Sequence, residues 1–379
     1  MRILMLTHEY PPYPGGVGRY CASMAAAARR MGHEVTVLAP SHGGPTATSH
    51  SDGIEVIRFE GDVFHFKQMR PLIKRIQQLL RARPFDLVHA ADWPTLIALG
   101  KLKTPRATQR VATLHGTDVI LIRQSIRARL TRAGAALANF DRYACNSAYT
   151  QGLLKQHFPK LHARTIVTPL GVDAEWFQTA PLEHQQAFRQ SLHAKDHELL
   201  VLTVARLDPR KGQKTTIAAL AALPPDLKER VRYVCVGKEV VPGYADQLTL
   251  LAKEKGVPLN LTGRLPDEAL KAAYACATVF ALTGEVVPGK VEGFGLVLLE
   301  AAAQGLPAVV THVQALPEVV AHQTTGWVCE GPEALAQAFE QALRRTDPIL
   351  KAACVQHASH FTWDRCAALT YVSPPSHAA

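Results

Sequence analysis

The residues best suited to chemistry in this sequence are two cations and two acids in its second half. Arg206 and Lys211 follow the apolar run 198–205 and precede a helical stretch, so both fall at a predicted strand-to-helix turn. A planar guanidinium and a mobile ammonium at such a turn suit a diphosphate. The competing interpretation is surface charge near a turn, which the position directly after a buried strand disfavours.

The two acids, Glu292 and Glu300, flank the start of a predicted helix. Glycines before that helix let backbone approach a ligand closely. Helix formers run from Phe294 to Gln304, and Gly305 then ends the helix. Free N–H groups at a helix start favour an anion, whereas carboxylates accept hydrogen bonds from hydroxyl groups. The stretch predicts a ligand with phosphate and sugar parts, although a capped surface helix with incidental acids explains the stretch alone equally well.

The first half opens with a buried strand over residues 2–7, followed by the loop Gly15-Gly16-Val17-Gly18 and a helix expected from Arg19 to Met31. A glycine loop at the first turn of a βαβ unit is a common ligand site in parallel α/β sheets. The dinucleotide fingerprint would need a third glycine at position 21, where Cys21 stands, which argues against a nicotinamide enzyme. His115 is a second candidate because it follows the strand 111–114 at a glycine turn, although a buried core histidine is the alternative.

Strand and helix patterns alternate in both halves, which predicts two doubly wound α/β domains. Further strands are expected at 34–39, 54–59, 86–90, 143–147, 231–237, 259–263 and 308–310, and another strand-plus-turn unit is expected at 274–282. We expect a first domain of residues 1–173, joined by a last helix within about 360–379, and a second domain of residues 174–359.

The composition indicates a globular protein, with 47% apolar and 20% charged residues over 379 positions. Seven scattered cysteines form neither a disulfide framework nor a metal-spaced cluster, which suggests reduced thiols in the cytoplasm. We expect no signal peptide and no membrane span, because no apolar run is long enough.

Positive charge is concentrated in the first half. Residues 1–170 hold 23 Lys and Arg against 10 Asp and Glu, a net charge of +13, while the remainder has a net charge of −3. The pattern over Met69 to Ala82 predicts a basic amphipathic helix with Lys74, Arg75, Arg81 and Arg83, and a second basic helix is expected at Arg123, Arg127, Arg129 and Arg132. The first of these helices either packs on the sheet with a solvated basic face or is a membrane-surface element that attracts anionic lipid.

Taken in order, these motifs resemble those of a retaining glycosyltransferase of family 4, which has the GT-B fold. The resemblance extends from Met1 to about Tyr371. It rests on Gly15-Gly16-Val17, Leu114-His115-Gly116, Gly171-Val172-Asp173, Ala205-Arg206-Leu207 with Lys211-Gly212, Glu292-x7-Glu300, Gly305-Leu306-Pro307, Leu316-Pro317-Glu318 and Thr325-Gly326. Two positions depart from the family pattern, because Ala205 replaces a usual glycine and Leu170 a common asparagine.

The resemblance implies two Rossmann-like domains, the second binding a nucleotide-sugar donor and the first an acceptor, with the last helix crossing back to the first domain. It implies that Glu292, His115, Arg206 and Lys211 are catalytic. The implied donor-binding residues are Gly15, Gly16, Arg206, Lys211, Arg264, Glu292, Gly293, Phe294, Gly295, Leu296 and Glu300. Glu292 would contact the sugar, Glu300 the ribose and His115 the transferred hexose. The absence of an Asp-x-Asp pair fits an enzyme without metal or cofactor, in which cations and a helix dipole stabilise the diphosphate.

The expected reaction moves a hexose from GDP-mannose or a UDP-hexose to a hydroxyl of a lipid, lipid-linked glycan or other cell-envelope glycan. The protein would be cytoplasmic, and its basic first domain could hold it at an anionic membrane surface. A small phosphorylated or acidic acceptor explains the same charge, and a sugar-nucleotide epimerase is the nearest rival enzyme. A non-catalytic sugar-nucleotide binder is disfavoured because both acids are present. A nucleic-acid-binding protein is disfavoured because the basic helices lack interleaved aromatics.

Overall fold

The fold is taken from a computed structural model, which describes residues 1–13, 15–62, 68–130, 132–345 and 347–371. The chain forms two compact units. The first contains Met1–Gly171 and the segment that begins at Thr362, and the second contains Val172–Phe361.

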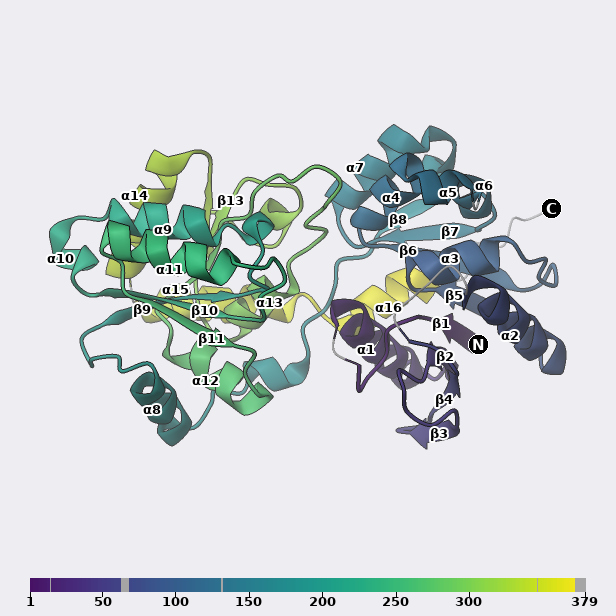
Figure 1. The fold of residues 1–379 in the computed structure, drawn as a ribbon. Coiled ribbons are helices and arrows are strands. Elements are labelled where there is room, and N and C mark those ends of the chain that lie inside the picture. Colours follow the sequence, from purple (N-terminus) through teal and green to yellow (C-terminus); the bar gives the residue numbers. More distant parts are fainter. Residues whose placement is uncertain (14, 63–67, 131, 346, 372–379) are drawn as a thin grey trace. The chain divides into compact units, whose positions relative to one another are not determined.

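The first unit is built on an eight-stranded sheet with the strand order β3-β4-β2-β1-β5-β6-β7-β8 (Figure 1). Neighbouring strands are parallel except β3 and β4, which are antiparallel. Its strands are β1 (Arg2–Leu6), β2 (Glu34–Pro40), β3 (Thr48–Ser51), β4 (Ile54–Phe59), β5 (Leu87–Ala90), β6 (Gln109–Leu114), β7 (Arg142–Cys145) and β8 (Thr165–Val167). The central strands are almost wholly buried, as expected for a parallel sheet that is covered on both faces.

The helices of the first unit connect these strands, and the last one is contributed by the end of the chain. They are α1 (Gly16–Arg30), α2 (Met69–Ala82), α3 (Trp93–Gly100), α4 (Thr117–Gln124), α5 (Ile126–Leu130), α6 (Ala133–Leu137), α7 (Ala148–His157), the 3₁₀ helix η2 (Pro159–Arg164) and α16 (Trp363–Tyr371). Helix α16 packs against α1, so the chain returns to the first unit after completing the second. This confirms the predicted return of the last helix.

The second unit has a six-stranded parallel sheet with the order β11-β10-β9-β12-β13-β14. Its strands are β9 (Leu199–Val204), β10 (Val231–Val236), β11 (Leu259–Gly263), β12 (Val279–Leu282), β13 (Ala308–Thr311) and β14 (Gly326–Cys329). Its helices are α8 (Leu182–Ser191), α9 (Gln213–Ala221), α10 (Pro225–Lys228), α11 (Tyr244–Lys255), α12 (Asp267–Cys276), α13 (Leu296–Ala303), α14 (Pro332–Arg344) and α15 (Pro348–Ser359), with the 3₁₀ helices η3 (Ala174–Phe177), η4 (Pro209–Lys211) and η5 (Leu316–Glu318). Two sheets of this kind confirm the predicted pair of doubly wound α/β domains.

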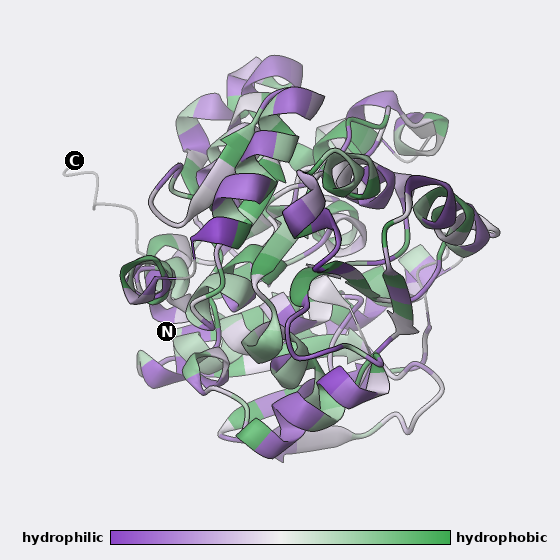
Figure 2. Cartoon of the chain, turned by 90° about the vertical axis from the view of Figure 1, so that its left-hand side faces the viewer, coloured by the Kyte–Doolittle hydropathy of each residue, from purple (hydrophilic) through white to green (hydrophobic). Residues whose placement is uncertain are grey.

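Amphipathic helices cover these sheets, and Figure 2 shows ribbons in which hydrophobic and hydrophilic residues alternate. Helix α2 is the clearest case, because Met69, Leu72, Ile76 and Leu79 recur at helical spacing and are buried. Its residues Arg70, Lys74 and Arg81 are exposed. The predicted basic amphipathic helix is therefore confirmed. None of the described helices combines the length and the apolar composition that a membrane span requires.

Three details of the first unit differ from the prediction. Helix α1 begins at Gly16, three residues before the expected start. Arg83 does not join the exposed basic face of α2, because its guanidinium pairs with Glu55 and donates a hydrogen bond to Thr36. The second basic helix is divided instead between α4 and α5, and Arg132 adopts a left-handed conformation (φ 53°) at the start of α6. The edge strands β3 and β8 were not predicted, because neither carries a long apolar run.

Candidate functional site

In the sheet of the second unit, the order in which the chain places its strands reverses at the neighbouring pair β9 and β12. We call this point the strand reversal. From β9 the chain builds β10 and β11 on one side, and it then returns to place β12, β13 and β14 on the other. Ligands of open α/β sheets bind outside the carboxyl ends of the strands at such a reversal. The residues that follow β9 include Arg206 and Lys211, and those that follow β12 lead to Glu292, so both predicted groups lie at this point.

The turn after β9 is held in shape by its own side chains. Asp208 accepts a hydrogen bond from the backbone N–H of Arg210 at 3.1 Å and lies 3.5 Å from the ammonium of Lys290. Burial raises the pKa of Asp208, but these donors outweigh it, and the pKa of this carboxyl is lower than usual. Gly212 closes the turn with φ of 74°, and a Cβ there would lie 1.7 Å from the carbonyl oxygen of Thr283. Only glycine fits where this turn meets the end of β12.

Lys211 and Glu292 are brought together across 81 residues of sequence. The ammonium of Lys211 lies 2.5 Å from Glu292 Oε2, and the two side chains are 12% and 13% exposed. Arg210 lies 3.6 Å from the same oxygen and donates a hydrogen bond to the carbonyl of Val291 at 2.8 Å. The backbone N–H of Glu292 donates to Gln314. One carboxylate therefore faces two cations in a largely shielded setting.

Two further predicted cations, Arg206 and Arg264, are exposed. Arg206 follows β9 and Arg264 follows β11, so both stand at the carboxyl edge of the sheet. Among the residues that the structure describes, the side chain of Arg206 has no hydrogen-bond or ion-pair partner. It can therefore turn toward an anion without breaking an internal contact.

Helix α13 begins where the prediction placed a phosphate. Gly295 precedes the helix with φ of 91°. Among the described residues, no N-cap side chain accepts a hydrogen bond from the backbone N–H groups at the start of this helix. Gly293 and Phe294 are buried, while Leu296 is partly exposed at the first turn. Backbone N–H groups at a helix start of this kind are able to bind an anion.

Glu300 lies inside α13 and is separated from the Lys211–Glu292 pair. Its side chain is buried, and Oε2 accepts a hydrogen bond from the hydroxyl of Tyr274 at 2.9 Å. The two predicted acids therefore have different surroundings, one beside cations and the other beside a phenol.

In the first unit, His115 follows β6 and is partly exposed. Its Nε2–H donates to the carbonyl of Ala91 at 2.9 Å, and its backbone N–H donates to Asp118 at 2.8 Å. Asp118 is buried and also accepts from the N–H of Val119, so it holds the turn that carries His115. Gly15 and Gly16 are exposed at the start of α1, and a Cβ on Gly15 would meet the carboxylate of Glu9.

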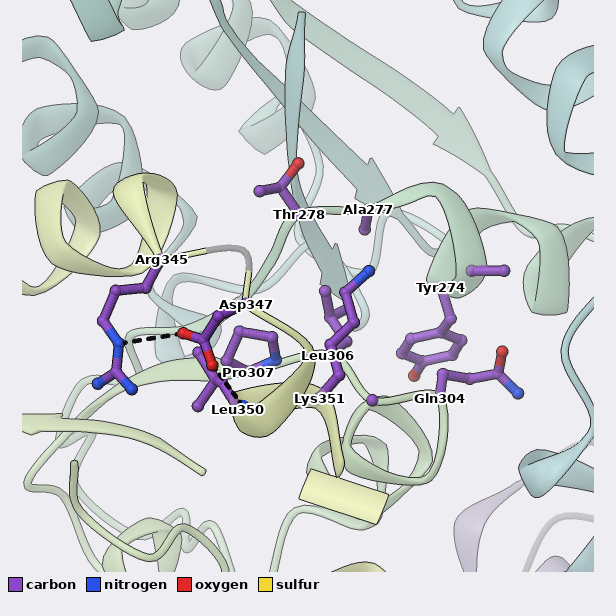
Figure 3. A pocket seen from close by; sticks show the side chains of 12 residues that line it. Tyr274, Ala277, Thr278, Gln304, Leu306, Pro307, Arg345, Asp347, Leu350 and Lys351 are labelled. Carbon is purple, nitrogen blue, oxygen red and sulfur yellow. Dashed lines mark hydrogen bonds and ion pairs between the residues drawn. The ribbon is translucent and has the colours of Figure 1, made fainter. Parts of the chain in front are cut away.

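A cavity of about 110 Å³ lies elsewhere in the second unit (Figure 3). Its wall includes residues just before β12, such as Thr278, and residues just before β13, such as Pro307. It is thus at the amino ends of these strands, opposite the edge that carries Arg206 and Glu292. Arg345 at its rim already pairs with Asp347 at 3.5 Å.

Three residues of the site region were not predicted. Arg210 lies in the same turn as Lys211, and its distinguishing feature, burial against the loop before Glu292, is visible only in the fold. Gln314 and Tyr274 contact Glu292 and Glu300 from segments 22 and 26 residues away in sequence. No local pattern marks either of them.

Comparison with known families gives two adjacent matches. The model described as Glycosyltransferase Family 4 matches residues 14–176, and the model described as Glycosyl transferases group 1 matches residues 184–360. Together they cover both units and every predicted site residue.

Similar proteins agree with these matches. The chain is 28% identical over 382 residues to a GDP-mannose-dependent alpha-(1-6)-phosphatidylinositol dimannoside mannosyltransferase of Mycobacterium tuberculosis, covering 97% of this chain and 94% of that protein. It is 30% identical over 345 residues to the corresponding monomannoside mannosyltransferase of Mycolicibacterium smegmatis, covering 87% and 86%. Among solved structures, sucrose-phosphate synthase from Thermosynechococcus elongatus superposes with a TM-score of 0.78 at 22% identity, covering 97% and 96%, which shows the GT-B fold. The chain therefore belongs to family 4 of the glycosyltransferases and is a retaining hexosyltransferase.

Proposed function

We propose that the protein transfers mannose from GDP-mannose to a hydroxyl of a phosphatidylinositol mannoside or a similar lipid-linked glycan. The donor half of this proposal is supported by the cluster of Arg210, Lys211 and Glu292 at the strand reversal of the second sheet, with Arg206 in the same turn. Relatives of nearly full length whose names specify GDP-mannose favour that donor over a UDP-hexose.

The second unit is proposed to bind the donor. Arg206 and Lys211 would hold the diphosphate together with the backbone around Phe294, Gly295 and Leu296. Negative charge grows on the leaving diphosphate in the transition state, and preorganised cations stabilise it there. Gly15 and Gly16 are proposed to assist at the diphosphate, Arg264 to border the base and Gly293 to give the backbone room near the sugar.

The carboxylates and His115 are proposed to recognise the sugar parts. Glu292 would accept hydrogen bonds from the hexose, and Glu300 from the ribose. Glu292 is paired with Lys211, so a phosphate held by Lys211 would compete with this contact. His115 is proposed to lie beside the transferred hexose, with its ring held by the carbonyl of Ala91.

No metal is required by this proposal. The bond between the anomeric carbon and the phosphate oxygen breaks, the bond to the acceptor oxygen forms on the same face, and the departing phosphate oxygen takes the acceptor's proton.

The acceptor is proposed to be a lipid at an anionic membrane surface. Helix α2 exposes Arg70, Lys74 and Arg81, and the α4–α5 region exposes Ile126 at 73% beside Arg123 and Arg129. Basic side chains around an exposed apolar residue suit the headgroup region of a membrane. The protein would then act as a peripheral membrane enzyme in the cytoplasm.

The test combines donor choice with one variant. We expect GDP-mannose, but not UDP-glucose, to support radiolabel transfer to phosphatidylinositol mannoside, and we expect Arg206→Ala to lower turnover about 10²–10³-fold. Near-normal turnover of Arg206→Ala with its true substrates would contradict the proposed role of Arg206.

Membrane attachment is tested separately by vesicle sedimentation. We expect binding to vesicles of anionic lipid to fall with salt and to weaken in a variant with alanine at Arg70, Lys74 and Arg81. Transfer to inositol phosphate without vesicle binding would instead identify a soluble phosphorylated acceptor.

A further inference from the structure

A polar cluster lies at the strand reversal of the first sheet. From β1 the chain builds β2, β4 and β3 on one side, and it then returns to β5 and continues to β8 on the other. Strands β1 and β5 are neighbours, with Leu6 paired to Ala90. The residues that follow these two strands, His8 and Asp92, therefore stand where an open α/β sheet binds its ligand.

Asp92 is the fixed part of this cluster and is 3% exposed. Its Oδ1 accepts hydrogen bonds from the backbone N–H and hydroxyl of Thr95. Its Oδ2 accepts from the backbone N–H of His8 at 2.7 Å and from the hydroxyl of Thr7 at 3.0 Å. These contacts leave the carboxylate little freedom to move.

His8 is the accessible part of the cluster. Its Nδ1 lies 2.8 Å from Asp92 Oδ2, its Nε2 lies 3.9 Å from Glu9 Oε1, and its side chain is 18% exposed. Burial lowers the pKa of His8, but the two carboxylates outweigh burial and raise it above its ordinary value. Glu9 is 23% exposed and lies against Gly15 of the glycine loop.

Another histidine nearby shows what a purely structural role looks like. His89 is wholly buried between the hydroxyls of Tyr371 at 2.9 Å and Thr113 at 2.7 Å. Both of its ring nitrogens are therefore satisfied inside the protein. His8 differs because a buried carboxylate supports a ring that still reaches the surface.

The charges of the cluster indicate what it can bind. Two carboxylates and one imidazole carry no net positive charge even when His8 is protonated, so these side chains do not attract a phosphate, whereas the diphosphate proposed near Gly15 and Gly16 would meet backbone N–H groups. Hydroxyl groups suit the cluster because each can donate to a carboxylate and accept from an imidazole N–H. No group of three or more His, Cys, Asp or Glu side chains in the described part of the chain is arranged to hold a metal ion.

We propose that His8 and Glu9, with Asp92 as the positioning residue for His8, form a subsite for the hydroxylated ring of the acceptor rather than for its phosphate. This proposal rests on the proposed function, since it names the part of the acceptor that reaches the strand reversal of the first sheet. The acceptor's phosphate would then bind to other groups of the first unit, such as the exposed basic side chains of α2 or those of α4 and α5.

Kinetics with phosphatidylinositol mannoside in detergent micelles test the subsite. We expect His8→Ala and Glu9→Gln each to raise the acceptor KM about tenfold or more, because each loses a hydrogen bond to a charged group. Affinity for GDP, measured by calorimetry, should change less than threefold. Asp92→Asn should raise the acceptor KM in the same way and shift the pH profile of acceptor binding. The matched control is His50→Ala, an exposed histidine of β3, which should leave both constants unchanged.

A binding measurement separates this proposal from the proposed function. Saturation-transfer NMR with methyl α-D-mannoside, in the presence of GDP-2-fluoromannose to fill the donor site, should show contact in the wild type and in His50→Ala. We expect the signal to be lost in His8→Ala and to persist when equal inorganic phosphate is added. An unchanged signal in His8→Ala, or displacement by phosphate, would overturn the subsite even if transfer itself is confirmed. Absence of transfer with an intact, His8-dependent NMR signal would instead remove the proposed acceptor or donor and keep the subsite.

Discussion

The ion pair between Lys211 and Glu292 leads to a prediction with opposite effects on nucleotide binding and on transfer. The two charged atoms are 2.5 Å apart, so Glu292 competes with a phosphate for the donors of the Lys211 ammonium. Glu292→Gln keeps the shape of the side chain but removes its charge. We therefore expect GDP to bind more tightly to the variant, while mannosyl transfer falls about 10²-fold because the hexose loses its carboxylate contact.

The size of the gain in GDP affinity follows from the exposure of the pair. Side chains that are 12% and 13% exposed are more shielded than a surface pair, so we take about 1 kcal/mol, the upper end of the range for exposed pairs. That corresponds to about fivefold tighter GDP binding at 25 °C. Isothermal titration calorimetry measures it directly, with GDP as the titrant.

Two variants serve as comparisons in this experiment. Lys211→Ala should weaken GDP binding about tenfold or more, because a charge-assisted contact to phosphate is lost. Glu285→Gln, an exposed acid that precedes Glu292 in the same loop, should leave GDP affinity unchanged. If Glu292→Gln weakened GDP binding as Lys211→Ala does, Glu292 would be needed to orient the lysine, and the idea of competition would be refuted.

Three further predictions concern stability. Gly212→Ala should lower the free energy of unfolding by more than about 2 kcal/mol in denaturant titrations, because its Cβ would meet the Thr283 carbonyl. Gly289 has a similar φ of 75° but open space around it, so Gly289→Ala should lower the free energy of unfolding less, and equal losses would contradict the steric argument. The pKa of Asp92 is about 2, since its donors and His8 outweigh burial, so Asp92→Asn should cost roughly 2 kcal/mol at pH 7, and this difference should close as the pH falls from 4 to 2. Burial lowers the pKa of His89 to about 3, so below pH 6.5 the unfolded chain binds a proton that the folded chain does not. The free energy of unfolding should therefore fall by up to about 1.4 kcal/mol per pH unit as the pH is lowered from 6.5 toward 3. Thermal melts over this pH range test this, and an unchanged dependence of stability on pH in His89→Gln would contradict it.

The sequence was most informative where a residue's role depends on its neighbours along the chain. The apolar runs that became β1, β9 and β13 are buried on both faces, so their composition alone separates them from loops. The helical pattern of α2 also predicted its buried face correctly. Edge strands such as β3 were missed because all four of its residues are exposed and carry no hydrophobic pattern.

Contacts between residues far apart in the sequence could not be predicted, for a physical reason. Lys211 and Glu292 could be predicted as two motifs, but not as a pair, because only the pairing of β9 with β12 places their turns at one edge. Arg83 was assigned to a solvated face because its charge fits the helical pattern, yet it lies at the end of α2, where Glu55 of β4 is within reach. The chemistry of a charged residue can be predicted from its type, but its partner depends on the order of the strands in the sheet.

The two strand reversals hold their charged groups in different ways, and this difference bears on mechanism. Asp92 receives hydrogen bonds from three other residues and is 3% exposed, so the carboxylate that faces the His8 ring is held in place by the protein itself. The Glu292 carboxylate is held by ion pairs with Lys211 and Arg210, and Lys211 reaches it through a long side chain, so these side chains can exchange partners by breaking ion pairs alone. A binding site that must hold and release a charged nucleotide benefits from such exchangeable contacts, whereas a nucleophilic hydroxyl is best oriented by contacts that do not move. We therefore expect donor analogues to change the environment of Lys211 in NMR spectra while the ring signals of His8 stay in place.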